Sequence, residues 1–346
     1  MPANRQSKFI AVLLVAMALP AFGACKKDQA DGGADSPAAK GQFAYLPKDA
    51  NWVVGVYPQQ LASSAMFNEY VVPDLAKSPE YQELKAACGF DPATAISALV
   101  FAGNTDDDAA VGMVKGVSKA QFVQCVPALA ASGDEKPTVT EDGDYVKVEA
   151  GGQATWLGWV DDKTLVGRSG ARDKATIEAV VKTTEGLDKN ENMMKLIGKL
   201  DSKATVWFTV HNKTPDQPLA GVPVQAQAIY GSVNFAQGLA LNFTLQQSSA
   251  EEAQSTVATM TPQLAAVKQM MPFLAKLEMK PEGSDVQVSL SLNNDELKEL
   301  APLLQQQLGG MMPGMMGGHG GMDHAGHGHG HDMAHDEEAD EAPEGE

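Results

Sequence analysis

The order of predicted elements repeats along the chain. A strand at 51–57, a hairpin with strands at 96–103 and 109–117, and a helix over 118–132 are followed by further hairpins and a closing helix. From residue 204 the order begins again, as strand, hairpin, long helix, hairpin and helix. Each unit must bury its apolar strand faces against its helices. The sequence therefore predicts an α+β fold, a duplicated unit of antiparallel sheet packed by helices, whose first copy is larger by one hairpin.

The two long helices support the duplication. Residues 127–131 read PALAA and residues 262–266 read PQLAA, at the same place in the element order. Ser249 and Glu252 form a capping-box pattern at the start of the second helix. Spacings of four and three place its apolar residues on one face: Ala253, Val257, Met260, Leu264, Val267 and Met271. We expect this face to pack on the sheet, with binding of apolar ligands as the alternative, and we expect the two prolines to kink or interrupt their helices.

The N-terminus has the pattern of an export signal. Arg5 and Lys8 precede an uncharged run from Phe9 to Ala24, 16 residues long, whereas a membrane-spanning helix needs roughly 20. Small residues then lead into Cys25. This ending resembles the lipobox of bacterial lipoproteins, although Phe22 stands where that family usually has leucine. An ordinary cleavable signal with an incidental cysteine is the alternative.

The lipoprotein resemblance implies removal of residues 1–24 and an N-acylated, diacylglyceryl Cys25, with palmitate-like chains that hold the protein to membrane lipid. Lys26 and Lys27 follow the cysteine, and the absence of an aspartate there favours the outer membrane of a bacterial cell envelope. Residues 25–42 are polar and without periodicity, which predicts a flexible tether.

Charge excludes one class of partner. The formal charge is −18, and removal of Arg5 and Lys8 with the signal makes it −20. Such a chain repels nucleic acid, so we expect no nucleic-acid binding. Between tether and tail, we predict a first α+β unit at 43–200 and a smaller second unit at 201–308. Residues 309–346, Gly/Met/His-rich and then acidic, are predicted to form a disordered tail.

Two cysteines remain after lipidation of Cys25. Cys88 and Cys125 would close a loop of about 38 residues, for which the loop-entropy model gives roughly 4 kcal/mol as an upper figure. Export to an oxidising compartment favours a disulfide between them. Two buried free thiols that pack as small apolar residues are the alternative. Neither cysteine has a histidine or a second cysteine nearby in sequence, which argues against catalysis.

A second resemblance concerns the first half of the folded part. Phrases such as FAYLPKDANWVVGV and CGFDPATAISALVFAG are similar to those of exported bacterial proteins of unknown function. This resemblance implies a setting and no activity.

Motifs that would indicate an enzyme are absent from the sequence. The chain has no P-loop, dinucleotide fingerprint, HExxH, GxSxG or paired CxxC. His211 ends a strand and is interpreted as a structural residue. Asp106, Asp107 and Asp108 lie in a hairpin turn without the spacing of a calcium loop. We therefore expect a non-enzymatic protein, with an unrecognised hydrolase as an alternative.

The tail concentrates metal-ligand types. Imidazole suits Zn, Cu(II) and Ni, and thioethers suit Cu(I). The candidate ligands are His319, His324, His327, His329, His331, His335, Met311, Met312, Met315, Met316, Met322, Met333 and Asp323. Ordering a glycine-rich chain costs about 1–2 kcal/mol per residue, so any site would be dynamic, and binding without biological use is the alternative.

The leading hypothesis is a lipid-anchored envelope protein with a non-enzymatic binding or scaffold role toward an unknown envelope protein or ligand. The rivals are a metal-sequestering lipoprotein and a carrier of apolar ligands.

Overall fold

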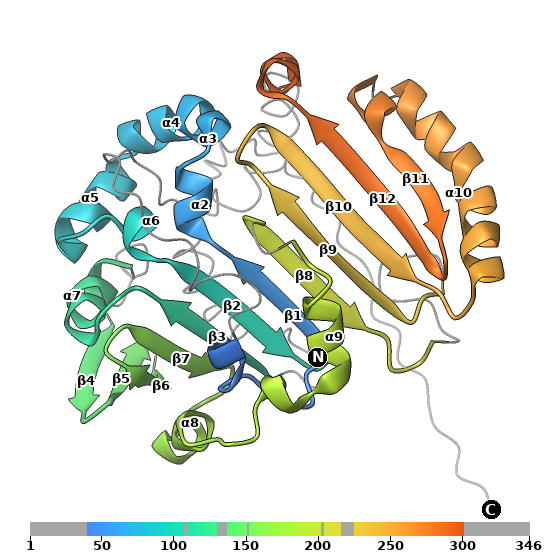
Figure 1. The fold of residues 1–346 in the computed structure, drawn as a ribbon. Coiled ribbons are helices and arrows are strands. Elements are labelled where there is room, and N and C mark those ends of the chain that lie inside the picture. The colour runs from blue at the N-terminus through green and yellow to red at the C-terminus, as the bar shows by residue number, and fades with distance from the viewer. Residues whose placement is uncertain are drawn as a thin grey trace, which may run out of the picture. The chain divides into compact units, whose positions relative to one another are not determined.

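Twelve strands form one antiparallel sheet in the part of the chain that the computed structural model describes, which is residues 40–106, 109–129, 137–150, 152–201, 204–215, 225–270 and 272–300. The predicted signal peptide, nearly all of the tether and the whole tail from residue 309 lie outside the described residues. In Figure 1 the strands run as a continuous row from β4 to β11.

The first half of the sheet extends outward from β1. Its strands are β1 (Trp52–Val56), β2 (Ala98–Gly103), β3 (Ala110–Lys115), β4 (Thr138–Asp142), β5 (Tyr145–Ala150), β6 (Gln153–Asp161) and β7 (Thr164–Arg168). They lie in the spatial order β1-β2-β3-β7-β6-β5-β4. The hairpins follow the predicted ones closely, because alternating β-branched residues and Gly or Asp turns mark them clearly.

The second half repeats this arrangement in the opposite direction. Its strands are β8 (Val206–His211), β9 (Ala228–Asn234), β10 (Leu239–Gln246), β11 (Glu278–Glu282) and β12 (Asp285–Leu292), in the order β8-β9-β10-β12-β11. In both halves the third strand pairs with the last strand of the closing hairpin, and β4 and β5 are the extra hairpin of the first half. The unit is therefore duplicated, and the two copies join through antiparallel β1 and β8. The domain limits given above stay predictions, since strands of both copies share one sheet.

A layer of short helices lies between β1 and β2 in the chain. It contains α2 (Pro58–Ala62), α3 (Ala65–Tyr70), α4 (Val72–Lys77), α5 (Pro79–Cys88) and α6 (Pro92–Ala95). Side-chain oxygens of Ser64, Ser78 and Asp91 cap three of these helices. Gly89, with a φ of 71°, ends α5 as the sequence predicts.

The remaining helices cover the two sides of the sheet. We call one side the α10 face, because α7 (Lys119–Leu129) and α10 (Ala250–Met270) pack on it, together with the 3-10 helix Pro272–Lys276 and a helical turn at 294–300. We call the other side the α9 face. It is covered over the first half and the centre by α8 (Lys174–Val181), α9 (Glu191–Ile197) and the 3-10 helices Lys40–Phe43 and Leu187–Lys189.

Helix α10 differs from its prediction in one respect. It continues unbroken through Pro262, and α7 likewise contains Pro127, so the expected interruptions are wrong. A proline removes a single backbone hydrogen bond, which a helix anchored by packing on the sheet tolerates. Ala253 is buried, and Val257 and Met260 pack beside Val286 and Val288.

The predicted capping box forms with a shift. The Glu252 N–H donates to Ser249 Oγ at 3.2 Å, whereas the Glu252 carboxylate accepts from the N–H of Ser248, one residue earlier than the motif requires.

Candidate functional site

Three rows of apolar side chains cross the centre of the sheet on the α10 face. Directly paired residues point to the same side of a sheet. Val54 pairs with both Phe101 and Phe208, and Trp52 pairs with Val210. In the third row, Val56 pairs with Val206, and Val206 pairs with Val233 of β9. No polar residue interrupts the rows where they cross β1 and β8.

The middle of these rows is half-buried. We define the apolar strip as seven half-buried residues of β1, β8 and β9, namely Trp52, Val54, Val56, Val206, Phe208, Val210 and Val233. On this face, apolar clusters form under α7, under α10 and under the helical turn at 294–300. Those clusters include Val56 and Phe208 at the margins of the strip and leave out its other five members. In Figure 1 β1 and β8 occupy the middle of the sheet, with α7 and α10 near opposite ends.

Two glycines on this face mark close approaches of neighbouring groups. A Cβ on Gly103 would come within 2.7 Å of the Trp52 ring, so this glycine leaves room for the ring beside β2. A Cβ on Gly231 would come within 2.6 Å of Phe243 Cβ and of the Asn242 carbonyl oxygen, so this glycine leaves room for strand β10. Glycine inside a strand commonly marks such a close approach.

Charged residues lie beyond the ends of the strip. Asp106, just past β2, pairs with Lys213, just past β8, at 3.0 Å. Lys298 pairs with Glu69 of α3 at 3.5 Å. Both pairs are exposed, so each contributes little to stability. They leave the strip itself uncharged.

A small apolar cavity lies between the helical layer and the sheet. Its volume is about 20 Å³, and it is lined by Leu84, Phe90, Pro92, Ile96, Val114, Val117, Phe122, Cys125 and Leu165. That volume corresponds to about one water molecule. This cavity is too small to enclose an acyl chain.

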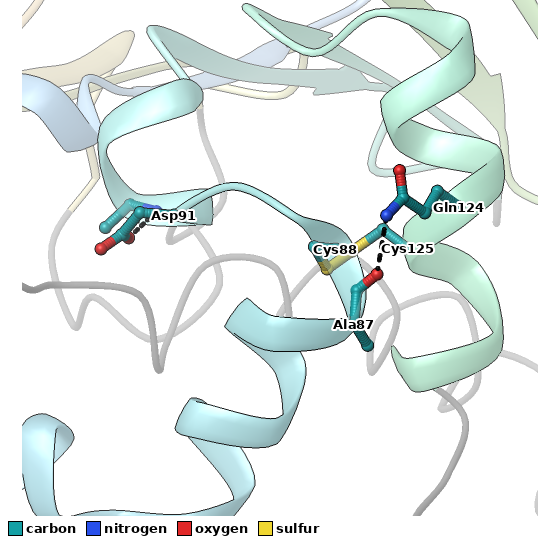
Figure 2. Close-up of a disulfide and its surroundings, with 6 residues drawn as sticks. Ala87, Cys88, Asp91, Gln124 and Cys125 are labelled. Carbon is teal, nitrogen blue, oxygen red and sulfur yellow. Dashed lines mark hydrogen bonds between the residues drawn. A yellow bond between two sulfur atoms is a disulfide. The ribbon is translucent and has the colours of Figure 1, made fainter.

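The disulfide joins Cys88, at the end of α5, to Cys125 in α7, 37 positions further along the sequence. Both residues are almost fully buried, 1% and 5% exposed. Figure 2 shows the bond between the two helices, with the Gln124 amide nitrogen donating to the Ala87 carbonyl beside it at 3.3 Å. The bond ties the helical layer to a helix that packs on the sheet.

A polar network lies on the α9 face, on the second half. Lys199 Nζ donates to the Tyr230 hydroxyl at 3.2 Å, and that hydroxyl donates to Asp285 Oδ2 at 3.0 Å. Lys199 Nζ also lies 5.0 Å from the centre of the Tyr230 ring. Burial, followed by the bond to Asp285, raises the pKa of Tyr230. The phenol stays protonated, and the network connects Lys199, just after α9, to strands β9 and β12.

The remaining predicted positions are placed as follows. His211 ends β8, half-buried, and burial together with the Lys213 charge lowers its pKa. Of the three aspartates in the hairpin turn, the structure describes Asp106, and Asp107 and Asp108 lie outside the described residues. Cys25 and every candidate metal ligand of the tail also lie outside them. Among described residues, no group of three or more His, Cys, Asp or Glu side chains is arranged to hold a metal. Within the same residues no helix is long and apolar enough to cross a membrane.

No family model matches the chain, and no curated protein matches it. Solved structures that resemble it include three crystal forms of a protein named TP0453. Form III gives a TM-score of 0.45 at 9% identity and covers 76% of this chain and 97% of that chain. Form I gives 0.44 at 10%, covering 75% and 96%, and form IV gives 0.44 at 11%, covering 76% and 95%. No conclusion about function follows from a likeness this distant.

Proposed function

We propose that this protein is a lipid-anchored component of the bacterial envelope that binds an apolar segment of a partner protein on the apolar strip. The observation that supports the proposal is the half-buried state of seven apolar side chains at the centre of the sheet. Exposed contiguous apolar surface on a folded protein commonly marks an interaction site. The role is one of binding, with no reaction assigned.

The size of the strip favours a single segment as its occupant. Seven half-buried side chains expose on the order of 300 Å², a modest patch for a monomer. A stable complex of two folded proteins buries about 800 Å² on each partner. A helix or an extended segment of the partner fits the strip better than a second globular surface does. The cavity of about 20 Å³ near the disulfide gives no support to the alternative of an enclosed carrier.

Site-specific crosslinking tests the strip. A photo-crosslinking side chain at Val54 should capture one envelope protein in intact cells. The same side chain at Val139, a half-buried position of edge strand β4, is the matched control. A Val206→Thr substitution, which replaces one methyl group by a hydroxyl of similar size, should weaken the capture. Equal capture from Val54 and Val139, or no effect of the threonine, would refute the proposed site.

The lipid anchor is a separate proposal that rests on the lipobox resemblance. Mass spectrometry of the mature protein should find Cys25 as the first residue, carrying acyl chains. The acylated protein should also sediment together with outer-membrane fragments. An unmodified Cys25 would refute the anchor and leave the apolar strip untouched.

Metal binding by the tail stays a second proposal, supported by the ligand types in residues 309–346 alone. Calorimetry with Cu and Zn should show binding to the full chain that is lost when the chain ends at Leu308. Equal weak binding by both proteins would contradict it.

A further inference from the structure

The two edges of the sheet, as the described residues form it, differ in what they offer to a further strand. Strand β4 forms one edge and β11 forms the other. In an antiparallel pair, alternate residues of an edge strand direct their backbone N–H and C=O groups to the neighbouring strand, and the residues between them direct these groups outward. The register of each hairpin therefore determines which residues point outward.

The register of the β4–β5 hairpin leaves Val139 and Glu141 pointing outward. Its two-residue turn makes Asp142 and Tyr145 a hydrogen-bonded pair, and every second residue of β4 before Asp142 is likewise bonded to β5. Val139 and Glu141 lie between these positions. No described residue outside β5 pairs with β4. Two N–H groups and two C=O groups of this edge are therefore directed away from the sheet.

The other edge is blocked by a proline. In the β11–β12 hairpin, Glu282 and Asp285 form the hydrogen-bonded pair next to the turn, so Met279 and Pro281 point outward. Proline has no N–H, and proline on an edge strand is a common means of preventing further pairing. The outer edge of β11 therefore offers only one of the two donors that β4 offers.

This difference follows the duplication of the unit. Hairpin β6–β7 of the first copy corresponds to β11–β12 of the second copy. The outer edge of β6 is occupied by β5, whereas the equivalent edge of β11 carries Pro281. The extra hairpin of the first copy thus moves the open edge outward to β4.

The acidic residues of β4 do not protect its edge. Edge strands often avoid pairing by exposing uncompensated charges. The Glu141 carboxylate pairs with Lys119 of α7 at 2.8 Å, and the Asp142 carboxylate pairs with Lys174 of α8 at 2.6 Å. Both lysines belong to the same molecule, so the two charges are balanced before a further strand arrives.

Two molecules of this chain fit each other at β4 in one antiparallel register. When Thr140 lies opposite Thr140 of the second molecule, both outward residues of each strand meet an outward residue of the other, because Val139 lies opposite Glu141. The outward groups, two N–H and two C=O from each strand, then all form hydrogen bonds. No like charges stand directly opposite each other, since Asp142 lies opposite Thr138.

Other registers are worse. Sliding the strands by two residues in one direction sets Glu141 opposite Glu141 of the second molecule, and like charges directly opposite each other are destabilising. Sliding them in the other direction sets Glu141 opposite Pro137, which has no N–H to donate. The edge of β4 is therefore self-complementary in a single register.

We propose that this protein forms a twofold-symmetric dimer in which β4 of each molecule pairs antiparallel with β4 of the other. A twofold contact closes the assembly at two molecules. Pairing of β4 with β11 would instead continue head to tail, and the missing N–H of Pro281 disfavours it. The interface shares no residue with the apolar strip, so the inference does not depend on the proposed function.

The dimer should be weak and reversible. Strands of 5 residues bury less surface than the 800 Å² or so on each partner that is typical of a stable complex. Sedimentation velocity of the full chain should show the monomer giving way to a dimer as the concentration rises from about 1 μM to about 500 μM.

A cysteine at the symmetry axis tests the register. Thr140 and its counterpart lie about 4.5 Å apart between Cα atoms, within the range that a disulfide spans. Thr140→Cys should therefore crosslink two molecules on mild oxidation. Thr138→Cys is the matched control, because Thr138 is exposed on the same face of β4 but roughly 14 Å from its counterpart. Wild type, oxidised in parallel, accounts for any dimer formed through Cys25.

A proline in β4 tests the backbone hydrogen bonds. Glu141→Pro gives β4 the feature that blocks β11, because it removes an outward N–H from each molecule and leaves the ladder to β5 intact. Two hydrogen bonds between the molecules are lost, so dimerisation should weaken about tenfold or more. Glu141→Gln keeps the N–H and is the matched control, with an expected change within about twofold.

Three results would overturn the inference. They are a chain that stays monomeric up to about 500 μM and does not crosslink through position 140, equal crosslinking of Thr138→Cys and Thr140→Cys, and a dimer that Glu141→Pro leaves unchanged. Thermal unfolding checks that each variant is folded, and if Glu141→Pro does not fold, the two cysteine variants decide.

Crosslinking in cells identifies the occupant of this edge. The photo-crosslinking side chain at Val139 should capture only a second molecule of this chain, whose mass distinguishes it from the envelope protein captured at Val54. Capture of a different protein at Val139, without a second molecule of this chain, would assign the edge to another partner and would overturn the dimer.

Discussion

Removal of the disulfide should destabilise the protein by a magnitude that follows from its position. The bond joins positions 37 apart, and the loop-entropy model gives roughly 4 kcal/mol for a loop of that length. This figure is an upper one, because a compact unfolded chain gains less freedom than a random coil. For a folded unit of this size, each kcal/mol lowers Tm by about 2–4 °C, so the expected loss is at most about 8–16 °C.

Burial of the bond determines how the experiment is done. Cys88 and Cys125 are almost completely buried, so a thiol reductant reaches them only when the helical layer opens. The protein should therefore be reduced in urea and refolded before scanning calorimetry. Cys88→Ala/Cys125→Ala is the matched variant. Alanine keeps an apolar side chain in both places, whereas serine would bury an unpaired hydroxyl.

Three comparisons decide the outcome. Oxidised wild type should melt highest, reduced wild type and the double alanine variant should melt lower, and only wild type should respond to reductant. Hydrogen exchange should quicken first in α5, because the bond anchors the end of that helix to α7. A change in Tm below about 2 °C on reduction would refute the reasoning and favour the alternative of two thiols that pack without bridging.

Three further predictions concern the sheet, His211 and α10. Gly55→Ala should cost about 1–3 kcal/mol in urea unfolding, because its Cβ would lie 2.1 Å from the buried Trp207 ring, whereas Gly41→Ala, with nothing within 4 Å, should cost little; similar costs for both would contradict the close approach. Burial and the Lys213 charge lower the pKa of His211 in the folded state. As the pH falls, the unfolded chain therefore protonates His211 before the folded chain does, so the free energy of unfolding should decrease below about pH 6.5. His211→Gln should lose less stability than wild type between about pH 7.5 and about pH 5.5, and identical losses would sink the assignment. Ser249→Ala should cost about 1 kcal/mol by removing the oxygen that accepts from the Glu252 N–H, and an unchanged midpoint in urea would show that Ser248 suffices.

Most of the element order and the hairpins were predictable from the sequence, whereas the β1–β8 pairing that joins both copies in one sheet was not. The turn residues between β2 and β3 and between β11 and β12 predict these hairpins. The spacing of apolar residues from Ala253 to Met260 predicts the buried face of the helix. The pairing of Cys88 with Cys125 was predictable as well, because the expected lipidation of Cys25 leaves only these two thiols. These features depend on residues that are close in sequence or few in number.

The apolar strip was not predictable, and the reason is physical. The strands at 51–57 and 204–210 consist mainly of apolar residues, without a regular polar alternation that would mark one face as solvent-exposed. That pattern does not tell which side a helix covers. Whether a helix covers a given strand depends on where α7 and α10 pack on the sheet. The apolar strip lies between these two helices. Similarly, the alignment of β10 with β12 depends on the register that pairs Asn242 with Ser289, which the sequence does not give.

The junction of β1 with β8 has a consequence for how the chain reaches its fold. Val56 pairs with Val206, which is synthesised 150 residues later. A nascent chain emerges from its N-terminus, so β1 can complete its hairpin with β2 long before its other edge is filled. During that interval an apolar strand presents unpaired N–H and C=O groups, the kind of edge on which chains aggregate. The sheet is therefore closed at its centre only when β8, from the second copy, reaches β1.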